Sequence, residues 1–195
     1  MTRVMLIGTV VLSLGALSAR AQQPPPKQPA PGASGAKTEM KAVPDEHFVM
    51  EAAHGGMAEV ELGKVAADKA SSDEVKKFGQ RMVDDHGKAN DELKTLVQNK
   101  GISLPTSLDS KHRATIDRLS KLSGAQFDKA YVQEMLKDHQ KDVADFRTES
   151  KSGKDADVKA WASKTLPTLE EHLKMVQDLS KGPVGTSGTK KPTGK

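Results

Sequence analysis

Apolar residues recur every three or four positions along most of the chain between residues 45 and 181, with charged residues between them. This spacing is the period of amphipathic helices, which bury one face and expose the other. Ser, Asp, Gly and Pro interrupt the pattern where helices would start and stop. The pattern predicts an all-α fold of four long helices and one short helix, expected at residues 45–69, 71–101, 107–122, 123–153 and 155–182.

Capping residues set these expected boundaries. Asp and Ser side chains accept hydrogen bonds from the first free N–H groups of a helix, and a Glu or Gln three residues later completes a capping box. The residues in such positions are Asp45, Ser71 with Glu74, Ser123 with Gln126, and Asp155. Gly101 is expected to end the second helix. Gly55, Gly56 and Gly63 predict that the first helix approaches its neighbours closely.

The short helix is expected between the second and third long helices, where a bundle needs a connection that returns along its length. This position favours a ferritin-like four-helix bundle with a crossover, in which the second and third long helices run parallel. An up-and-down bundle with the short helix across one end is the alternative, and the pattern does not separate the two.

The first residues have the features of a signal peptide. Arg3 is followed by an apolar run over residues 4–17 and then by Ala-Arg-Ala at 19–21, a small-residue cleavage pattern. The run is shorter than the roughly 20 residues that span a bilayer. We therefore expect residues 1–21 to be removed. The mature chain, with no transmembrane segment, would be periplasmic or secreted.

Composition separates the tails from the domain. Residues 22–44 and 182–195 are rich in Pro, Gly and Lys and poor in large apolar residues, so we expect a disordered linker and tail around one domain at 45–181. The chain has no Cys, which excludes disulfides and thiolate ligands. Its formal charge of +4 falls to +2 without residues 1–21, which hold two Arg and no acid. This small charge gives no reason to expect a nucleic-acid partner.

Three histidines occupy apolar positions of the predicted long helices. His86, His139 and His172 each stand where the three-and-four spacing calls for a buried residue. A weak internal repeat relates the first two, since residues 80–88 and 133–141 both read Gln-x-Met-x-x-Asp-His-x-Lys. If these two helices run parallel, the two motifs lie at one level of the bundle.

Glu59 lies on the apolar face of the first predicted helix and would complete a cluster of three histidines and one glutamate. Imidazole with carboxylate suits Zn, Cu or Fe. Met82 and Met135, one turn before two of the histidines, would add soft sulfur that favours Cu(I). Asp85 and Asp138 are secondary candidates, as ligands or as partners of the ligands. The alternative is a structural polar layer, hydrogen-bonded internally and without metal.

No residue pattern points to catalysis, since the sequence shows neither a Gly-rich phosphate loop nor a nucleophile elbow. A ferritin-type di-iron centre needs two Glu-x-x-His motifs, and the chain has one, Glu51 to His54, which we expect to be an exposed pair. His112 is expected to pack or cap, and His47 to be solvated. Enzymatic activity is therefore not favoured.

Several segments resemble a known bacterial family, called domain of unknown function 4142. They are GGMAEVELG at 55–63, FGQRMVDDH at 78–86, FDKAY at 127–131 and the later Asp138-His139. The resemblance implies an exported, ferritin-like helical bundle with no established reaction. The family is often labelled "predicted outer membrane protein", a label that the helical pattern does not support. Its recurring positions correspond here to Glu59, His86, His139 and His172.

Two functions remain open from the sequence. One is a periplasmic helical bundle that binds a transition metal through its interior histidines, for metal buffering or stress protection. The other is a non-enzymatic cell-envelope module that binds an unknown partner, in which the same histidines are only a structural layer.

Overall fold

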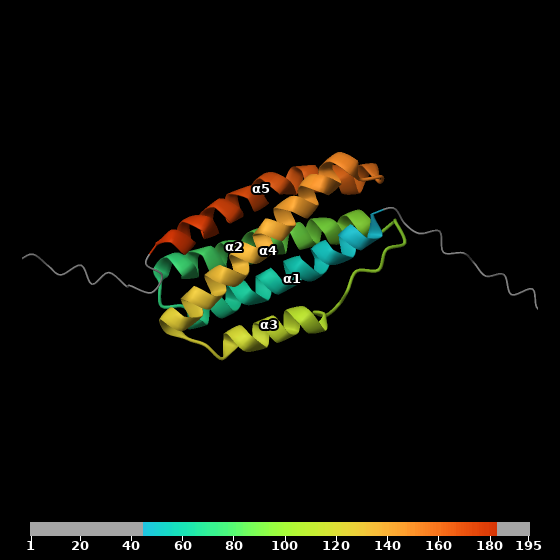
Figure 1. The fold of residues 1–195 in the computed structure, drawn as a ribbon. Coiled ribbons are helices and arrows are strands. Elements are labelled where there is room, and N and C mark those ends of the chain that lie inside the picture. Colours follow the sequence, from blue (N-terminus) through green and yellow to red (C-terminus); the bar gives the residue numbers. More distant parts are fainter. Residues whose placement is uncertain (1–44, 183–195) are drawn as a thin grey trace, which may run out of the picture. The chain divides into compact units, whose positions relative to one another are not determined.

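The structure is a computed structural model that describes residues 45–182. These residues form helices and no strand (Figure 1). The helices are α1 (Glu46–Lys69), α2 (Asp73–Val97), α3 (Ser110–Ser120), α4 (Gly124–Ser152) and α5 (Ala156–Lys181). The all-α prediction of four long helices and one short helix is confirmed for this range. The signal peptide, linker and tail predicted at residues 1–44 and 183–195 lie outside the described residues. Within the described range, no helix is long and apolar enough to cross a membrane.

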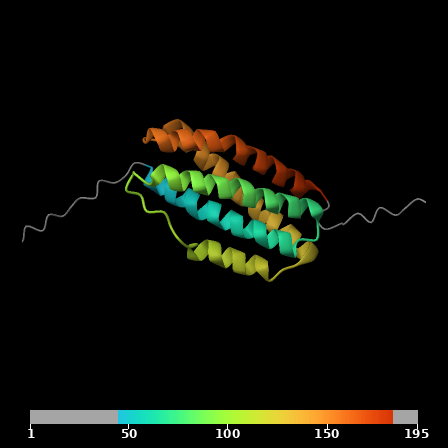
Figure 2. The ribbon, with the colours of Figure 1, turned by 180° about the vertical axis from the view of Figure 1, so that it is seen from behind.

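The helices form two hairpins. α1 packs mainly on α2 and α4 mainly on α5, while α3 lies against α1 and touches α4 (Figure 1). The connection after α2 and the short α3 carry the chain back along the bundle, so that α2 and α4 run in the same direction (Figures 1 and 2). This direction is the condition under which the two repeated motifs lie side by side.

Two predicted N-caps are confirmed, one by its hydrogen bonds and the other only by its position. Asp155 accepts hydrogen bonds from the N–H groups of Asp157 and Val158, both at 3.0 Å, and so caps α5. Ser123 occupies the N-cap position of α4, although its side chain makes no capping hydrogen bond.

The predicted role of Asp45 is wrong. Its backbone is left-handed, with φ of 65°, and its side chain does not cap α1. Its carboxylate instead accepts hydrogen bonds from the N–H groups of Lys154 and Asp155, both at 2.7 Å. Asp45 therefore ties the start of α1 to the turn between α4 and α5, a contact between residues far apart in the sequence.

The start and end of α2 also differ from the prediction. Ser72, not Ser71, is the N-cap, and its hydroxyl accepts from the N–H of Val75 and donates to Glu74. Ser71 donates from its N–H and its hydroxyl to the buried carboxylate of Asp128 on α4. The helix ends at Val97, and the residues up to Gly101 form a turn.

The short helix α3 is shorter than predicted, because Asp109 caps it from within the predicted range. The Asp109 carboxylate accepts a hydrogen bond of 2.8 Å from the N–H of His112. Residues 107 to 109 therefore belong to the connection before the helix.

The buried apolar residues form two clusters, one toward each end of the bundle. The first cluster includes Leu62, Ala66, Val75, Phe78, Met82, Phe127, Tyr131, Met135 and Val176. The second cluster includes Val49, Ala53, Leu93, Val97, Val143, Phe146, Val158, Trp161 and Leu169. Along each long helix the boundary between the clusters is a buried polar residue: Glu59, His86, His139 or His172. The core is therefore divided by a polar layer.

α1 and α2 approach each other closely at two glycines. A Cβ atom at Gly63 would lie 2.4 Å from the carbonyl oxygen of Gly79, which no real side chain tolerates. A Cβ at Gly56 would lie 2.2 Å from the side-chain oxygen of Asn90. At Gly55 there is nothing within 4 Å, so the predicted close approach holds for Gly56 and Gly63 and is wrong for Gly55.

Candidate metal centre

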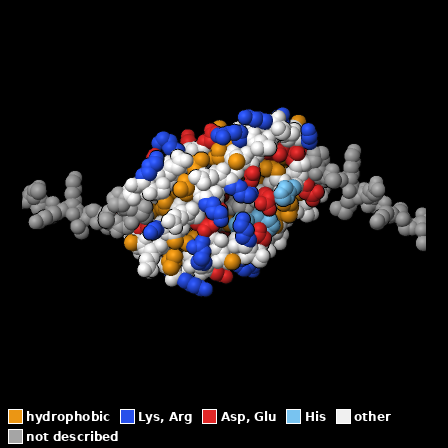
Figure 3. Space-filling model, in the orientation of Figure 1, with side chains coloured by type: hydrophobic (Ala, Val, Ile, Leu, Met, Phe, Trp, Pro, Cys, Tyr) orange, Lys and Arg blue, Asp and Glu red, His pale blue; other side chains and the backbone are white. Residues whose placement is uncertain are grey.

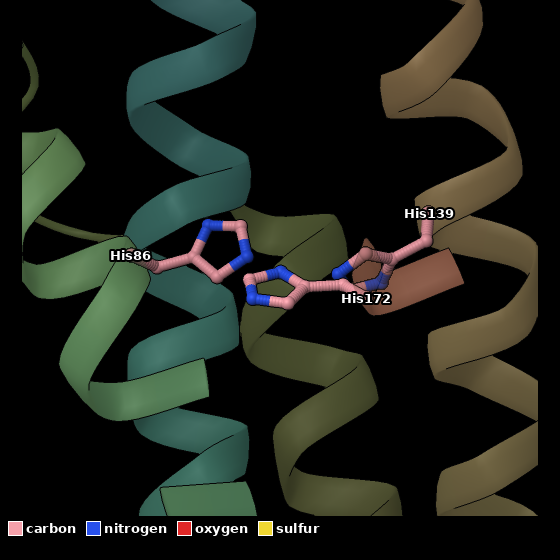
Figure 4. Close-up of side chains that lie close together, drawn as sticks. All are labelled: His86, His139 and His172. Atoms are coloured by element: carbon pink, nitrogen blue, oxygen red, sulfur yellow. The ribbon is translucent and has the colours of Figure 1, made fainter. Parts of the chain in front are cut away.

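Three histidine rings from three helices meet in the polar layer. His86 on α2, His139 on α4 and His172 on α5 are buried, with at most 6% of each residue exposed. One ring nitrogen of each lies within 4.8 Å of the others. The ring centroids are 5.3 to 5.7 Å apart, and Figure 4 shows the rings pointing toward one another. The sequence-predicted histidines are therefore brought together by the fold.

Hydrogen bonds fix two of these rings. His139 Nδ1 donates to the carbonyl oxygen of Met135 at 3.0 Å, because a carbonyl can only accept. His172 Nε2 lies 2.8 Å from the Asp85 carboxylate and donates to it. Each ring is thereby held with its other nitrogen free to act as an acceptor or a ligand.

The remaining nitrogens have no hydrogen-bond partner. These atoms are His86 Nε2, His139 Nε2 and His172 Nδ1, and all three are buried. A buried polar atom left unpaired costs about 1–3 kcal/mol, so such atoms are rare in native structures. Three of them on three neighbouring rings form a donor set that a metal ion would satisfy.

Glu59 extends this layer from α1, with 2% of the residue exposed. Its two carboxylate oxygens lie 2.9 Å from His86 Nδ1 and 3.3 Å from His139 Nδ1. Neither approach has hydrogen-bond geometry, and both oxygens lack a hydrogen-bond partner. Burial raises the pKa of Glu59 to about 7, although the neighbouring His139 lowers it. The site thus holds a carboxylate whose charge is not yet compensated.

Burial has the opposite effect on the imidazoles. It lowers the pKa of His86, His139 and His172 to about 4 each, since a low-dielectric interior disfavours the charged ring. All three rings are therefore neutral at pH 7. Neutral imidazole is the form that binds metal ions.

The secondary candidates lie around the layer. Met82 and Met135 are fully buried in the first apolar cluster, one helical turn from the histidines that follow them. Asp85 is half-buried and accepts hydrogen bonds from His172 and Arg81, which outweigh the effect of burial and keep its pKa below the usual range. Burial raises the pKa of Asp138, and the nearby His112 on α3 lowers it.

Sequence reasoning missed Asp142, one turn after His139 on α4. Burial and the neighbouring Glu59 raise its pKa well above the usual range, while His86 lowers it. Asp142, Glu59 and His86 line a cavity of about 20 Å³, which has room for one water-sized ligand but not for an organic substrate. The available signal was a break in the internal repeat, because the position equivalent to Asp142 holds Ala89.

Among the other histidines, the prediction for His47 is confirmed and the prediction for His54 is wrong. His47 is exposed, as expected. Glu51 and His54 do not form the expected exposed pair. Glu51 lies 3.4 Å from the Lys141 ammonium, and His54 is half-buried and faces α3.

The fold and the site define a class, all-α bundle proteins with a buried layer of three histidines and one glutamate. Within this class, the chain belongs to the family described as a domain of unknown function, DUF4142, whose sequence model matches residues 29–179. The resemblance found in the sequence is thereby confirmed. No curated protein matches the chain.

Solved structures with a similar fold include two DUF305 proteins and CopM. The DUF305 fragment from Deinococcus radiodurans has a TM-score of 0.61 and 13% identity, and the match covers 70% of this chain and 94% of that one. A DUF305 protein from Streptomyces coelicolor, described as a predicted secreted protein, has a TM-score of 0.60, 15% identity and coverage of 71% and 91%. CopM in its Cu(I)-bound form has a TM-score of 0.57, 17% identity and coverage of 69% and 94%. At these identities the likeness shows the fold alone.

Proposed function

We propose that this chain is an exported, ferritin-like helical-bundle protein that holds one transition-metal ion, Cu, Zn or Fe, for metal buffering or stress protection. The ligands are His86, His139 and His172, with Glu59 beside them. The observation that carries the proposal is the convergence of three buried, neutral imidazoles whose remaining ring nitrogens have no partner.

The donor set fits such an ion in charge and in size. Ligand atoms about 2.0–2.2 Å from a tetrahedral metal lie roughly 3–4 Å from each other, so a spread of 4.8 Å needs only small side-chain shifts. The Glu59 carboxylate offsets part of the ion's charge. The Asp85 carboxylate and the Met135 carbonyl hold two of the rings from behind, as partners of metal-ligating histidines do.

The comparisons and the N-terminal sequence support the location and the ligand class. CopM is a fold neighbour whose structure contains Cu(I), and a second neighbour is described as a "putative secreted protein". The first 21 residues have the pattern of a cleaved signal peptide, which would deliver the domain to the periplasm or the medium.

The alternative is a cell-envelope module that binds a partner and uses the histidines only as a structural layer. One observation favours it: His139 and His172 already make hydrogen bonds, as interior histidines without metal do. This alternative does not explain the three unpaired ring nitrogens.

The test is the metal content of the untagged mature chain by mass spectrometry, followed by titration with Cu(I), Zn²⁺ and Fe²⁺. Near-stoichiometric metal that is lost in His86→Ala/His139→Ala, with helix content unchanged by circular dichroism, supports the proposal. His47→Ala is the matched control, because this histidine is exposed. No bound metal and no measurable affinity would leave the envelope module.

The same titrations decide whether sulfur takes part. Met82→Leu/Met135→Leu keeps the apolar volume and removes both thioethers. If affinity for Cu(I) falls in this variant while affinity for Zn²⁺ does not, the thioethers are ligands. If both are unchanged, they only pack.

A further inference from the structure

A second group of metal-ligating side chains lies outside the polar layer, where α1, α3 and α4 meet. It consists of His54 on α1, Asp109 at the start of α3 and His112 one turn into α3, with Asp138 on α4 near His112. Residues 54 and 112 are 58 positions apart in the sequence, and the return of the chain through α3 brings them together.

Figure 3 shows where histidines reach the surface on the face of Figure 1. His side chains lie there beside acidic side chains. At the junction, the side chains of His54, His112 and Asp109 are 18%, 20% and 35% exposed. The group at the junction is therefore accessible from solvent.

We infer that His54, Asp109 and His112 form a second, shallower site that binds a divalent transition-metal cation at the junction of α1, α3 and α4. This site goes beyond the proposed function and does not depend on the interior histidines.

Asp109 arranges the ring of His112 for this purpose. One carboxylate oxygen caps α3 through the N–H of His112, and the other lies 2.9 Å from His112 Nδ1. If Nδ1 donates to the carboxylate, Nε2 carries the lone pair. A carboxylate that holds one nitrogen while the other binds the ion is the usual arrangement of metal-ligating histidines.

His54 supplies the observation that a capping role for Asp109 does not explain. Its Nδ1 atom is buried and has no hydrogen-bond partner, and it lies 4.0 Å from the Asp109 carboxylate, too far for a hydrogen bond. Its ring is nearly parallel to that of His112, with 17° between the planes and 6.3 Å between the centroids. A cation bound to both rings would use this unpaired atom.

The charge of the junction also favours a cation. Asp109 carries its full negative charge at neutral pH, because its hydrogen bonds with His112 lower its pKa. Asp138 adds a second carboxylate on the side toward α4, close enough to His112 to be affected by its charge. Lys111 and Lys137 also lie near Asp138, but both are exposed and their charge is screened by solvent.

The site is less preorganised than the interior one. Among the described residues, only the interior histidines already place three ligand atoms within 4.8 Å of one another. His54 and His112 must rotate to bind one ion, and their side chains, 18% and 20% exposed, have room to do so. The second site should therefore bind more weakly than the first.

The experiment is a calorimetric Zn²⁺ titration of the untagged full-length mature chain and four variants. Wild type should bind zinc in two classes of different affinity. His54→Gln/His112→Gln should lose the weaker class and keep the tighter one, while His86→Ala/His139→Ala should do the reverse. His47→Gln, which changes an exposed histidine outside the junction, should lose neither.

The outcomes for the two sites are separable. If the weaker class persists in His54→Gln/His112→Gln, the second site is wrong, whatever happens in the interior. If this variant abolishes the only class seen in wild type, the second site stands and the interior metal site falls. His54→Gln alone is the safeguard against misfolding, because His54 makes no hydrogen bond through its buried nitrogen and caps no helix. It should weaken the same class at least about tenfold.

Discussion

At the scale of single residues, Glu59 has the most informative environment. Its carboxylate is buried beside two imidazoles, accepts no hydrogen bond, and has a pKa of about 7. An acidic group in such a place destabilises the metal-free fold when it ionises, so its presence needs a reason other than packing. Compensation of a bound cation is such a reason.

Glu59→Gln tests whether Glu59 compensates the charge of a bound cation, because the substitution keeps the shape of the side chain and removes its charge. We expect the affinity for metal to fall by about 10–100-fold, the usual effect of losing a charged partner of a metal site. The metal-free variant should be at least as stable as wild type at pH 8, where wild-type Glu59 is ionised. Thermal unfolding with a chelator and metal titration measure the two effects.

Glu51→Gln is the control, since Glu51 is exposed on the same helix. Unchanged metal affinity in Glu59→Gln, or a loss of stability at pH 8, would contradict this account of Glu59.

The buried histidines predict the pH dependence of the metal-free protein. His86, His139 and His172 take up protons near pH 4 in the folded state and near pH 6.5 when unfolded. Glu59 acts in the opposite sense, since its folded pKa of about 7 lies above its unfolded value. Asp142 and Asp138 act in the same sense as Glu59, because burial raises the pKa of both in the folded state. The three histidines act against these carboxyls, because the unfolded chain takes up protons between pH 6.5 and 4 that the folded rings do not. The histidine contribution to stability should therefore fall as the pH falls through this range.

Denaturant midpoints at pH 7 and pH 5, with a chelator present, measure this dependence. The difference should shrink in His172→Gln and stay the same in His47→Gln. A difference between pH 7 and pH 5 that is the same in His172→Gln as in wild type would contradict the buried, neutral state of this ring.

At the scale of elements, the α1–α2 hairpin depends on the absence of side chains at Gly63 and Gly79. The backbone of each helix occupies the place that the other helix's Cβ would take. This close approach sets the distance between α1 and α2, and so the distance between Glu59 on α1 and His86 on α2. The spacing of the hairpin is therefore part of the site.

Gly63→Ala should destabilise the domain by about 1–3 kcal/mol, because its Cβ would meet the Gly79 carbonyl oxygen and the helices must separate. Gly55→Ala is the matched control on the same helix, where nothing lies within 4 Å. It should stabilise by up to about 1 kcal/mol through helix propensity. Chemical unfolding measures the free energy of unfolding of both variants. Equal changes would show that the close approach of the two helices does not contribute to stability.

At the scale of the whole molecule, the polar layer separates two apolar clusters. Each long helix crosses from one cluster to the other at Glu59, His86, His139 or His172. Without an ion, the middle of the bundle is held by few hydrogen bonds and contains several unpaired polar atoms. An ion bound by α2, α4 and α5 would link the two hairpins there.

Metal binding should therefore stabilise the whole domain. At a free metal concentration about 100 times the dissociation constant, the gain is about 2.7 kcal/mol. Thermal unfolding should shift upward with Zn²⁺ or Cu(I), return on addition of chelator, and shift less in His86→Ala/His139→Ala, which keeps only the weaker site. An equal shift in that variant would place the stabilising ion elsewhere.

The sequence by itself determined the helices and the faces they bury. Helical period and capping are local properties, so the all-α class, the number of helices and the inward positions of His86, His139 and His172 followed from neighbouring residues. Membership of the family followed from short motifs in the same way.

Only the tertiary structure decided how these faces meet. The tie from Asp45 to the α4–α5 turn, the place of Asp142 beside Glu59, and the approach of His54 to His112 all join residues far apart in the chain. The same is true of the unpaired ring nitrogens, since a hydrogen-bond partner is present or absent according to the register between helices. That register depends on packing contacts such as the one between Gly63 and Gly79, which no local pattern encodes.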